Sequence, residues 1–580
     1  MMTTRVFHGG SVFTGSGSPL LGQAVIVRDE RIDRIVPESE LAAIIGAEPG
    51  GSVELIDLRG ALLSPGFQDA HIHAVGGGVE LLQCDLSGTG TAEEAVDAVR
   101  AYAEANPDEE WILGGGWSMD CFPGGNPTRD LLDAAAPGRP VLLASRDHHS
   151  IWASTEAIER AGITSETADP ADGVIIREAD GHPAGTFHEG AGELFNTARP
   201  VTGEDLRYRG LLRAQEELIA LGITGWQDAM VGSSAIGVPD PLTAYEQALA
   251  EGTLAVHVTG AQWWERDGGI EQVERMVAKR HRIAALGSPE RLELGTTKIM
   301  VDGVAENHTA AMLTPYRDAH GHDTHNHGLS FIDPEHLREY VTALDAAGQQ
   351  VHMHALGDRA VREALDALQD ARDANGPTDG RHHLAHLQIV AEEDVPRFAE
   401  LGAIANLQAL WATHEDQLDE LTLPYLQEGQ EARQYPFGDF VRAGVRLAAG
   451  SDWPVSSASP VDALHIAVNR TTPGSDREPL AGAHQRLDLA TAMAAYTSGS
   501  AYVNHRDHDT GTIAPGFRAD LVVLDPSPFD LPVEEIFRSR VVQTWIDGRR
   551  VYAAESALAT AEAAPTTEST ARTELEGELS

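Results

Sequence analysis

Short apolar runs alternate with helical patterns through the middle of the chain, from about residue 61 to residue 504. Eight such runs recur, at 61–73, 222–230, 255–264, 296–303, 350–355, 382–388, 403–409 and 446–453. Helical periodicity lies between most of them, at 205–220, 270–286, 334–347 and 358–374. Alternating strands and helices predict parallel strands, and eight units predict an α/β fold, the closed (β/α)8 TIM barrel. A doubly wound open sheet is the alternative.

The two ends of the chain have a different pattern. Apolar and polar residues alternate over 24–35, 52–57, 511–524 and 541–548, and glycine-rich turns separate these stretches. Such alternation predicts short strands. We therefore predict that residues 1–60 and 505–553 pair into one small composite β-sandwich domain beside the barrel at 61–504.

Two further segments stand apart from this plan. About 150 residues separate the first two apolar runs, more than one barrel helix needs, so we predict an insertion at about 75–215 that covers the mouth of the barrel. The end of the chain, 554–580, contains mainly Ala, Thr, Glu and Ser. We predict a disordered acidic tail there, because it cannot bury enough surface to offset chain entropy.

Composition narrows the classes of partner and compartment. The chain has 580 residues and a formal net charge of −47, which repels nucleic acid and anionic membranes. No apolar run approaches the roughly 20 residues needed to cross a bilayer. The start of the chain lacks a signal-peptide core, and only two cysteines occur, Cys84 and Cys121. We expect a cytoplasmic protein that acts on a small molecule.

Candidate chemistry begins at the end of the first run, with His71 and His73. In a strand, positions two apart share a face, so both imidazoles project together and can chelate one divalent ion. Lysine is scarce, since Lys279 and Lys298 are the only two. Lys298 lies in the apolar fourth run. It is either paired with Asp302 on the same face or held neutral and carbamylated, which would make it a metal-bridging carboxylate.

The later runs supply the rest of the candidate site. His354 is closer to the end of the fifth run than His352, which we expect one layer deeper. In the sixth run His386 is again nearest the expected mouth, and in the eighth Asp452 follows the apolar, small-residue strand. An aspartate there is often only a turn residue. Together, however, the candidate ligands His71, His73, Lys298, His354, His386 and Asp452 would meet at one mouth of a barrel. These nitrogen and oxygen ligands favour Zn²⁺, one ion or two, with other transition metals possible.

At these residues the sequence resembles the amidohydrolase superfamily. It is most similar to the amidohydrolase-3 group, which includes the YtcJ-like proteins and N-substituted formamide deformylase. The resemblance rests on 65–73, 298–303, 354–360, 381–386 and 450–455, in order and at plausible spacing. Two further segments, 146–149 and 185–189, look like family segments near the substrate. The sequence departs from the family at Ala385, where Glu is common, and at 306–309.

The resemblance implies metal-dependent hydrolysis of a non-peptide C–N bond, of amide or formamide type. A bound ion lowers the pKa of water toward about 7, and Asp452 would move the proton, with His354 and His386 as the other catalytic candidates. Candidate substrate contacts are Trp117, His149, Glu189, Asp302 and Trp453. Alternatives are deaminase, esterase, phosphoesterase or isomerase chemistry, or a non-catalytic binding subunit. A homodimer is expected only from the family.

Overall fold

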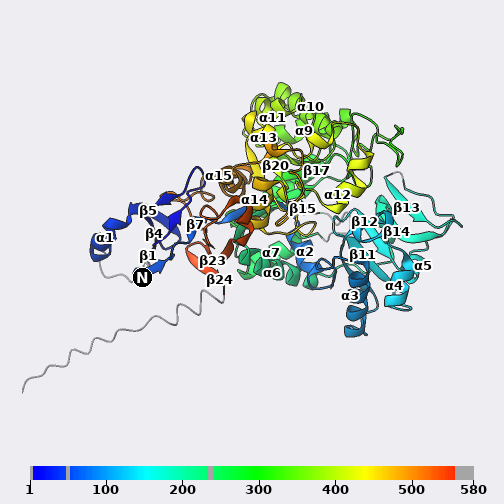
Figure 1. Ribbon diagram of the computed structural model, residues 1–580, viewed down its shortest axis with the longest axis horizontal. Helices are drawn as coiled ribbons and strands as arrows, with labels where there is room; N and C mark the ends of the chain where they lie inside the picture. Colours follow the sequence, from blue (N-terminus) through cyan, green and yellow to red (C-terminus); the bar gives the residue numbers. More distant parts are fainter. Residues whose placement is uncertain (1–3, 48–52, 171, 233–239, 555–580) are drawn as a thin grey trace, which may run out of the picture.

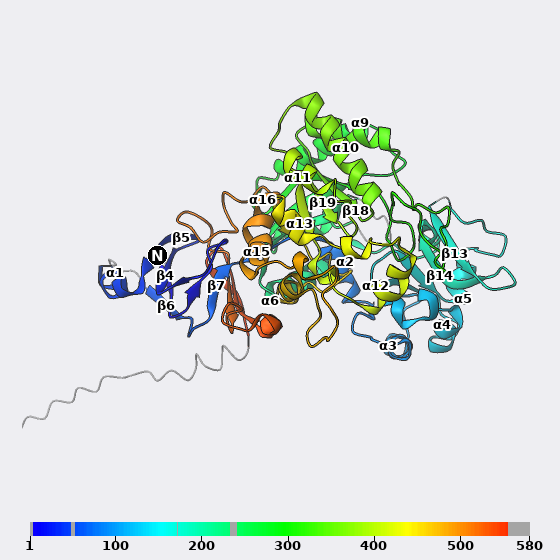
Figure 2. The ribbon, with the colours of Figure 1, turned by 45° about the horizontal axis from the view of Figure 1, so that its top comes forward.

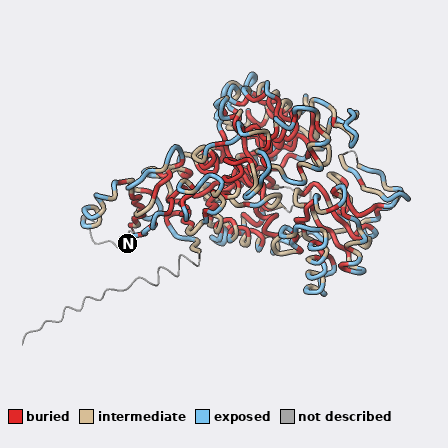
Figure 3. The backbone as a smooth tube through the Cα atoms, in the orientation of Figure 1, coloured by how far each residue is buried: buried red, intermediate tan, exposed pale blue. Residues whose placement is uncertain are grey.

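The computed structural model describes residues 4–47, 53–170, 172–232 and 240–554. The barrel lies between two smaller parts: a domain built from both ends of the chain on one side, and an inserted domain on the other (Figure 1). Buried residues are concentrated in the barrel and also occur in each of the two smaller parts (Figure 3). The predicted acidic tail falls, apart from Ala554, outside the described residues.

The barrel is a single sheet of eight parallel strands in chain order. The strands are β8 (Phe67–Ile72), β15 (Ile223–Val231), β16 (His257–Trp263), β17 (Leu292–Met300), β18 (Gln350–Ala355), β19 (His383–His386), β20 (Ile404–Leu407) and β21 (Leu447–Ala449). The first predicted run is split, because Leu62–Pro65 forms β7 of another sheet. The other seven predicted runs each overlap a barrel strand.

The first and last strands meet, so the sheet curls into a barrel and is not an open doubly wound sheet. The Asp452 backbone N–H donates to the His71 carbonyl at 2.7 Å. Gly450 makes this approach possible, because a Cβ there would lie 2.6 Å from the His71 backbone nitrogen. The predicted (β/α)8 fold is confirmed.

Helices surround the barrel sheet, as Figure 2 shows for α9, α10 and α11. The four predicted helices are present as α6 (Glu204–Ala220), α8 (Gln272–Ala284), α9 (Pro334–Ala346) and α10 (Asp358–Asn375). The others are α2 (Ala74–Glu80), α7 (Leu242–Glu251), α11 (Val395–Leu401), α12 (Asp416–Leu421), α13 (Phe437–Arg442), α14 (Pro460–Asn469), α15 (Leu489–Ala494) and α16 (Ser500–Val503).

The chain ends form two sheets that face each other. One has the order β5-β4-β1-β6 and the other β24-β23-β22-β7-β2-β3. Their bounds are β1 (Thr4–His8), β2 (Ser11–Val12), β3 (Leu20–Leu21), β4 (Gln23–Arg28), β5 (Arg31–Pro37), β6 (Val53–Asp57), β22 (Leu521–Asp525), β23 (Arg540–Ile546) and β24 (Arg549–Ala553), with helix α1 at Leu41–Ala47. Phe7 and Val25 of the first sheet pack with Leu63 and Trp545 of the second in one apolar core.

The inserted domain is built on a six-stranded mixed sheet of order β13-β14-β12-β11-β10-β9. Its elements are β9 (Cys84–Asp85), α3 (Ala92–Ala105), β10 (Ile112–Trp117), α4 (Arg129–Ala135), β11 (Val141–Ser145), β12 (Ser150–Ala153), α5 (Thr155–Arg160), β13 (Gly173–Arg177) and β14 (Pro183–Glu189). Separate apolar cores form around it, one of which includes Trp117 and Trp152 and the other Phe187 and Phe195. This domain therefore has its own core and presents the β11–β12 turn and the end of β14 to the barrel.

A buried histidine–aspartate contact joins the barrel to the terminal domain at the end opposite the strand C-termini. His257 of β16 lies 3.0 Å from the Asp520 carboxylate, and Asp520 also accepts hydrogen bonds from the Asp547 backbone N–H and the Thr510 hydroxyl. Both His257 nitrogens are occupied, because Nδ1 contacts the Glu290 carbonyl at 2.7 Å. The group is therefore a structural connection. Within the described ranges, no helix is long and apolar enough to cross a membrane.

Candidate metal centre

The structure brings the six predicted ligand residues to one mouth of the barrel. They come from the C-terminal ends of β8, β17, β18, β19 and β21 or directly after them. The six are His71, His73, Lys298, His354, His386 and Asp452, and five of them are less than 9% exposed. Strand ends in a parallel barrel converge at one face, which is why residues distant in sequence meet here.

Asp452 lies at the centre of this cluster. Its Oδ1 is 3.0 Å from His71 Nε2 and 3.2 Å from His73 Nε2, and its Oδ2 is 3.8 Å from His386 Nδ1. Lys298 Nζ lies 3.4 Å from His71 Nε2. The rings of His354 and His386 lie 4.4 Å apart, centre to centre. All six side chains are therefore neighbours.

Several of these polar atoms are buried without a hydrogen bond. Asp452 Oδ1, His73 Nδ1 and His386 Nδ1 have no hydrogen-bond partner in the described part of the chain. Buried polar atoms normally have a hydrogen-bond partner, so these unpaired atoms indicate a site for an ion or a solvent molecule. One ligand atom each from His71, His386 and Asp452 lies within 4.8 Å of the others. Imidazole and carboxylate ligands gathered in this way fit a divalent metal.

Burial sets the protonation states of the cluster. Burial and the nearby Lys298 lower the pKa of His71 to about 3, and burial holds the pKa values of His354 and His386 well below the usual range. These imidazoles are therefore neutral, the form that binds metal. Burial works to raise the pKa of Asp452, but the cluster of imidazoles around it favours the carboxylate form, so the pKa lies well below its usual value and Asp452 is ionised.

Two candidate ligands have strained backbones. His386 has a φ of 78° and Asp452 a φ of 58°, both in the left-handed region that side chains other than glycine rarely adopt. Each such residue costs about 1–3 kcal/mol and persists only where surrounding structure enforces it. Here the Asp452 backbone N–H bonds to His71, and the His386 backbone N–H donates to Gln408 Oε1 at 2.6 Å. The fold thus holds both side chains in the site.

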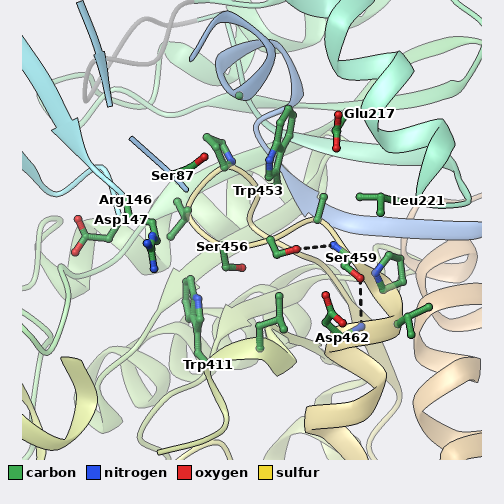
Figure 4. Close-up of a pocket in the computed structure, with 18 of the residues that line it drawn as sticks. Ser87, Arg146, Asp147, Glu217, Leu221, Trp411, Trp453, Ser456, Ser459 and Asp462 are labelled. Atoms are coloured by element: carbon green, nitrogen blue, oxygen red, sulfur yellow. Dashed lines mark hydrogen bonds between the residues drawn. The ribbon is translucent and has the colours of Figure 1, made fainter. Parts of the chain in front are cut away.

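An inner cavity of about 60 Å³ lies over the cluster, and its remaining wall is largely apolar. Met230, Trp263 and Met300 follow one another around the ends of β15, β16 and β17 and form one apolar contact group. A larger cavity of about 1060 Å³ adjoins it, and Asp147 and Trp411 line both. Figure 4 shows this outer cavity, with Trp411 and Trp453 on different sides of it.

The inserted domain contributes His149 to the inner cavity. His149 Nδ1 is 2.8 Å from Glu189 Oε2, and the barrel residue Thr309 donates to Glu189 Oε1 at 2.8 Å. Nε2 of His149 makes no hydrogen bond to any described residue. Burial works against the charge, but Glu189 raises the pKa of His149 to about 9, so this histidine is protonated at neutral pH. The pair also ties the inserted domain to the barrel.

This ion pair gives a pH-dependent stability. Because the pKa of His149 is raised from 6.5 to about 9, its stabilising effect is complete below about pH 6.5 and is lost as pH rises through about 9. We expect His149→Gln to lower the thermal midpoint below pH 6.5 and to have a smaller effect above pH 9, measured by calorimetry. His188→Gln is the control, since His188 contacts neutral groups, Ser150 and Asn126. A difference between native and His149→Gln proteins that stays constant with pH would contradict this.

Two predicted substrate contacts are corrected by their positions. Trp117 is fully buried in the core of the inserted domain, and its indole N–H donates to the Leu143 carbonyl at 3.0 Å. Asp302 is also fully buried, and its carboxylate accepts from the backbone N–H groups of Ala311, Leu356 and Gly357. Neither side chain lines the inner or the outer cavity. Asp302 organises the loops beside the site, and it is not the partner of Lys298.

The sequence did not single out every residue that lines the inner cavity. Met230 and Met300 were missed, although both lie at C-terminal strand ends, and strand-end position was the available signal. Of the other predicted substrate contacts, Trp453 lines the outer cavity and His149 the inner one, whereas Glu189 contacts His149 and lines neither. Trp411 lines both cavities, and its ring stacks on His386 at 5.4 Å.

Fold and site together define a class: a (β/α)8 barrel with a candidate metal centre at the C-terminal ends of its strands. Residues 54–552 match the model of the Amidohydrolase family, and the chain belongs to that family. It is 28% identical to a putative amidohydrolase, YtcJ, of Bacillus subtilis, over 94% of this chain and 99% of that protein. It is 27% identical to N-substituted formamide deformylase of Arthrobacter pascens, over 91% and 94%.

A solved structure has the same fold. The crystal structure of an uncharacterized metal-dependent hydrolase from Pyrococcus furiosus superposes with a TM-score of 0.67 and 24% identity, over 91% of this chain and 100% of that one. At this identity the likeness concerns the fold. The shared fold extends over the whole length of that chain.

Proposed function

We propose that this chain is a metal-dependent hydrolase that cleaves a non-peptide C–N bond of amide or formamide type. The observation that carries the proposal is the convergence of four histidines, one lysine and one aspartate on a cavity, with buried ligand atoms left unpaired. A relative with similarity over nearly the full length, the Arthrobacter protein, is named as an N-substituted formamide deformylase. Family membership and site chemistry support the same reaction class.

The residues that would hold the metal are His71, His73, Lys298, His354, His386 and Asp452. Their nitrogen and oxygen atoms favour Zn²⁺, as one ion or two. When bound, the ion supplies acidification of water and polarisation of the substrate carbonyl. Burial lowers the pKa of Lys298 to about 7, so a neutral amine is available to take up carbon dioxide. We propose that Lys298 is carbamylated and becomes a carboxylate ligand.

In this proposal Asp452 transfers the proton from the attacking water to the leaving group. It is ionised and buried, and its Oδ1 has no hydrogen-bond partner in the described residues. It accepts the proton of the attacking water and passes it to the leaving nitrogen, which must be protonated to depart as an amine.

His149 and the apolar wall orient the substrate. His149 lines the inner cavity with Nδ1 engaged by Glu189, so its Nε2–H is available to donate to the substrate carbonyl oxygen. Met230, Trp263 and Met300 offer an apolar surface, which favours a hydrophobic group next to the scissile bond. The outer cavity, with Trp411 and Trp453, accommodates the rest of the substrate.

A substrate panel with metal control tests this function. The purified protein is stripped with a chelator, reloaded with Zn²⁺, and assayed against N-benzylformamide, N-acyl amines, cyclic amides, aryl esters, phosphotriesters and aminopurines. We expect metal-dependent release of amine from a formamide or acyl amide. Turnover of esters or aminopurines alone, or amide turnover unaffected by the chelator, would contradict the proposal.

A further inference from the structure

A chain of buried hydrogen bonds runs through the barrel from its base to the candidate metal centre. It begins at Gln350, the first residue of β18, and continues through Gln227 of β15 and His352 of β18 to His71. All four side chains are at most 2% exposed. The reaction described above does not use Gln350, Gln227 or His352, and side chains of this polarity are costly to bury unless their hydrogen bonds are made.

The first amide in the chain has a fixed orientation. Gln350 Nε2 donates to the backbone carbonyls of Arg381 and Val503, both at 2.8 Å. Carbonyl oxygens only accept, so the amide nitrogen must point there and Gln350 Oε1 must accept. This oxygen accepts from the Thr296 hydroxyl at 2.7 Å and from Gln227 Nε2 at 3.4 Å.

The second amide follows from the first. Gln227 Nε2 donates to Gln350 and also to Asn504 Oδ1 at 3.1 Å, which leaves Gln227 Oε1 as an acceptor. That oxygen lies 2.7 Å from His352 Nδ1 and 3.0 Å from His383 Nε2. Each of these two nitrogens must therefore carry the proton of its neutral imidazole.

The same argument assigns the position of the proton on the candidate ligand His71. His352 carries its proton on Nδ1, so its Nε2 accepts, and His71 Nδ1 donates to it at 2.9 Å. The proton of His71 is thereby placed on Nδ1, and its Nε2 presents a lone pair. Lys298 Nζ lies 3.4 Å from His71 Nε2 and 3.5 Å from His352 Nε2, so it can donate to either of these lone pairs.

A consequence follows for the ion. His71 Nε2 and Asp452 Oδ1 lie 3.0 Å apart. In this tautomer both atoms offer lone pairs and neither carries a proton, so a cation between or beside them relieves their repulsion. The partner of a metal-binding histidine generally selects which ring nitrogen is free to coordinate.

We infer that Gln227 and His352 are positioning residues that fix the tautomer of His71, so that its Nε2 lone pair faces the candidate metal centre. The inference rests on the proposed function for the identity of that centre, but the tautomer itself is a property of the metal-free chain. Other contacts agree with it: Asn406 Nδ2 donates to His383 Nδ1 at 3.2 Å, which independently leaves the His383 proton on Nε2.

Two measurements test the inference. The first is ¹⁵N NMR of the metal-free native protein with labelled histidine, in which the His71 signals are identified by their loss in His71→Asn. We expect the proton of His71 on Nδ1; a proton on Nε2 overturns the inference. This result needs no substrate and no bound metal, so it stands whether or not the protein proves to be a hydrolase.

The second measurement is the affinity for Zn²⁺ alone, by competition with a chromophoric chelator. Gln227→Met keeps the shape but removes the acceptor, and we expect Zn²⁺ to bind about 10–100-fold more weakly. Gln262→Met is the matched control, because Gln262 is a buried glutamine of the adjacent β16 that donates to the Met276 and Leu294 carbonyls and to no histidine. Equal affinity in native and Gln227→Met proteins, with folding verified by thermal denaturation, overturns the inference.

Discussion

Replacing Asp452 by Asn is expected to lower kcat by about 10²–10⁴-fold, the range found when a positioned general base or acid is lost. The amide keeps the shape of the carboxylate but cannot accept the proton of water. It also cannot supply the negative charge that the unpaired Oδ1 offers to an ion. The effect is measured as kcat for the amide substrate that the panel identifies, at saturating Zn²⁺.

Asp520→Asn is the matched control for Asp452. Asp520 is also a fully buried aspartate beside a histidine, His257, but it lies where the barrel meets the terminal domain. We expect this variant to lower the thermal midpoint and to leave kcat close to native. An Asp452→Asn protein that retains native kcat would show that the proton is handled elsewhere.

Replacing Lys298 by Met is expected to reduce metal content and to lower turnover by about 100-fold or more, because the bound ion's polarisation of the substrate is worth several kcal/mol. Lys298 is 3% exposed, and burial lowers its pKa to about 7, so its neutral amine can react with carbon dioxide. In the native protein we expect a carbamate signal in ¹³C NMR after incubation with labelled bicarbonate.

The chain offers an unusual control for this experiment, since Lys279 is its only other lysine. Lys279→Met should keep the carbamate signal, the metal and the activity. Degassing the native protein at acidic pH should remove activity, and bicarbonate with metal should restore it. A Lys298→Met protein that keeps full metal occupancy and turnover would contradict the assigned role.

The sequence predicted the barrel because its signals are local and repeated. A polar residue lies at or just after the end of several apolar strands, as His73, His354, His386 and Asp452 do. A parallel barrel brings the C-terminal ends of its strands together in space. The predicted helices α6, α8, α9 and α10 agree with the structure to within two residues at each end. Apolar periodicity in amphipathic helices carries this information directly.

Other features depended on packing that no local pattern reveals. Trp117 has the same residue type as Trp453, but it faces the core of the inserted domain, whereas Trp453 lines the outer cavity. Asp302 follows an apolar strand as Asp452 does, yet three backbone N–H groups occupy its carboxylate. Gln227 gave no sequence signal at all, because its role comes from partners on other strands.

The central claim is that six side chains from five strand ends hold a divalent metal. The most direct test is anomalous X-ray diffraction from crystals of the Zn²⁺-loaded protein. The account predicts a zinc peak bonded to His71 and Asp452 and to at least one of His73, His354 and His386, at about 2.0–2.2 Å. Zinc located only elsewhere, such as at His257 and Asp520, or no zinc peak at all in the loaded crystal, would contradict it.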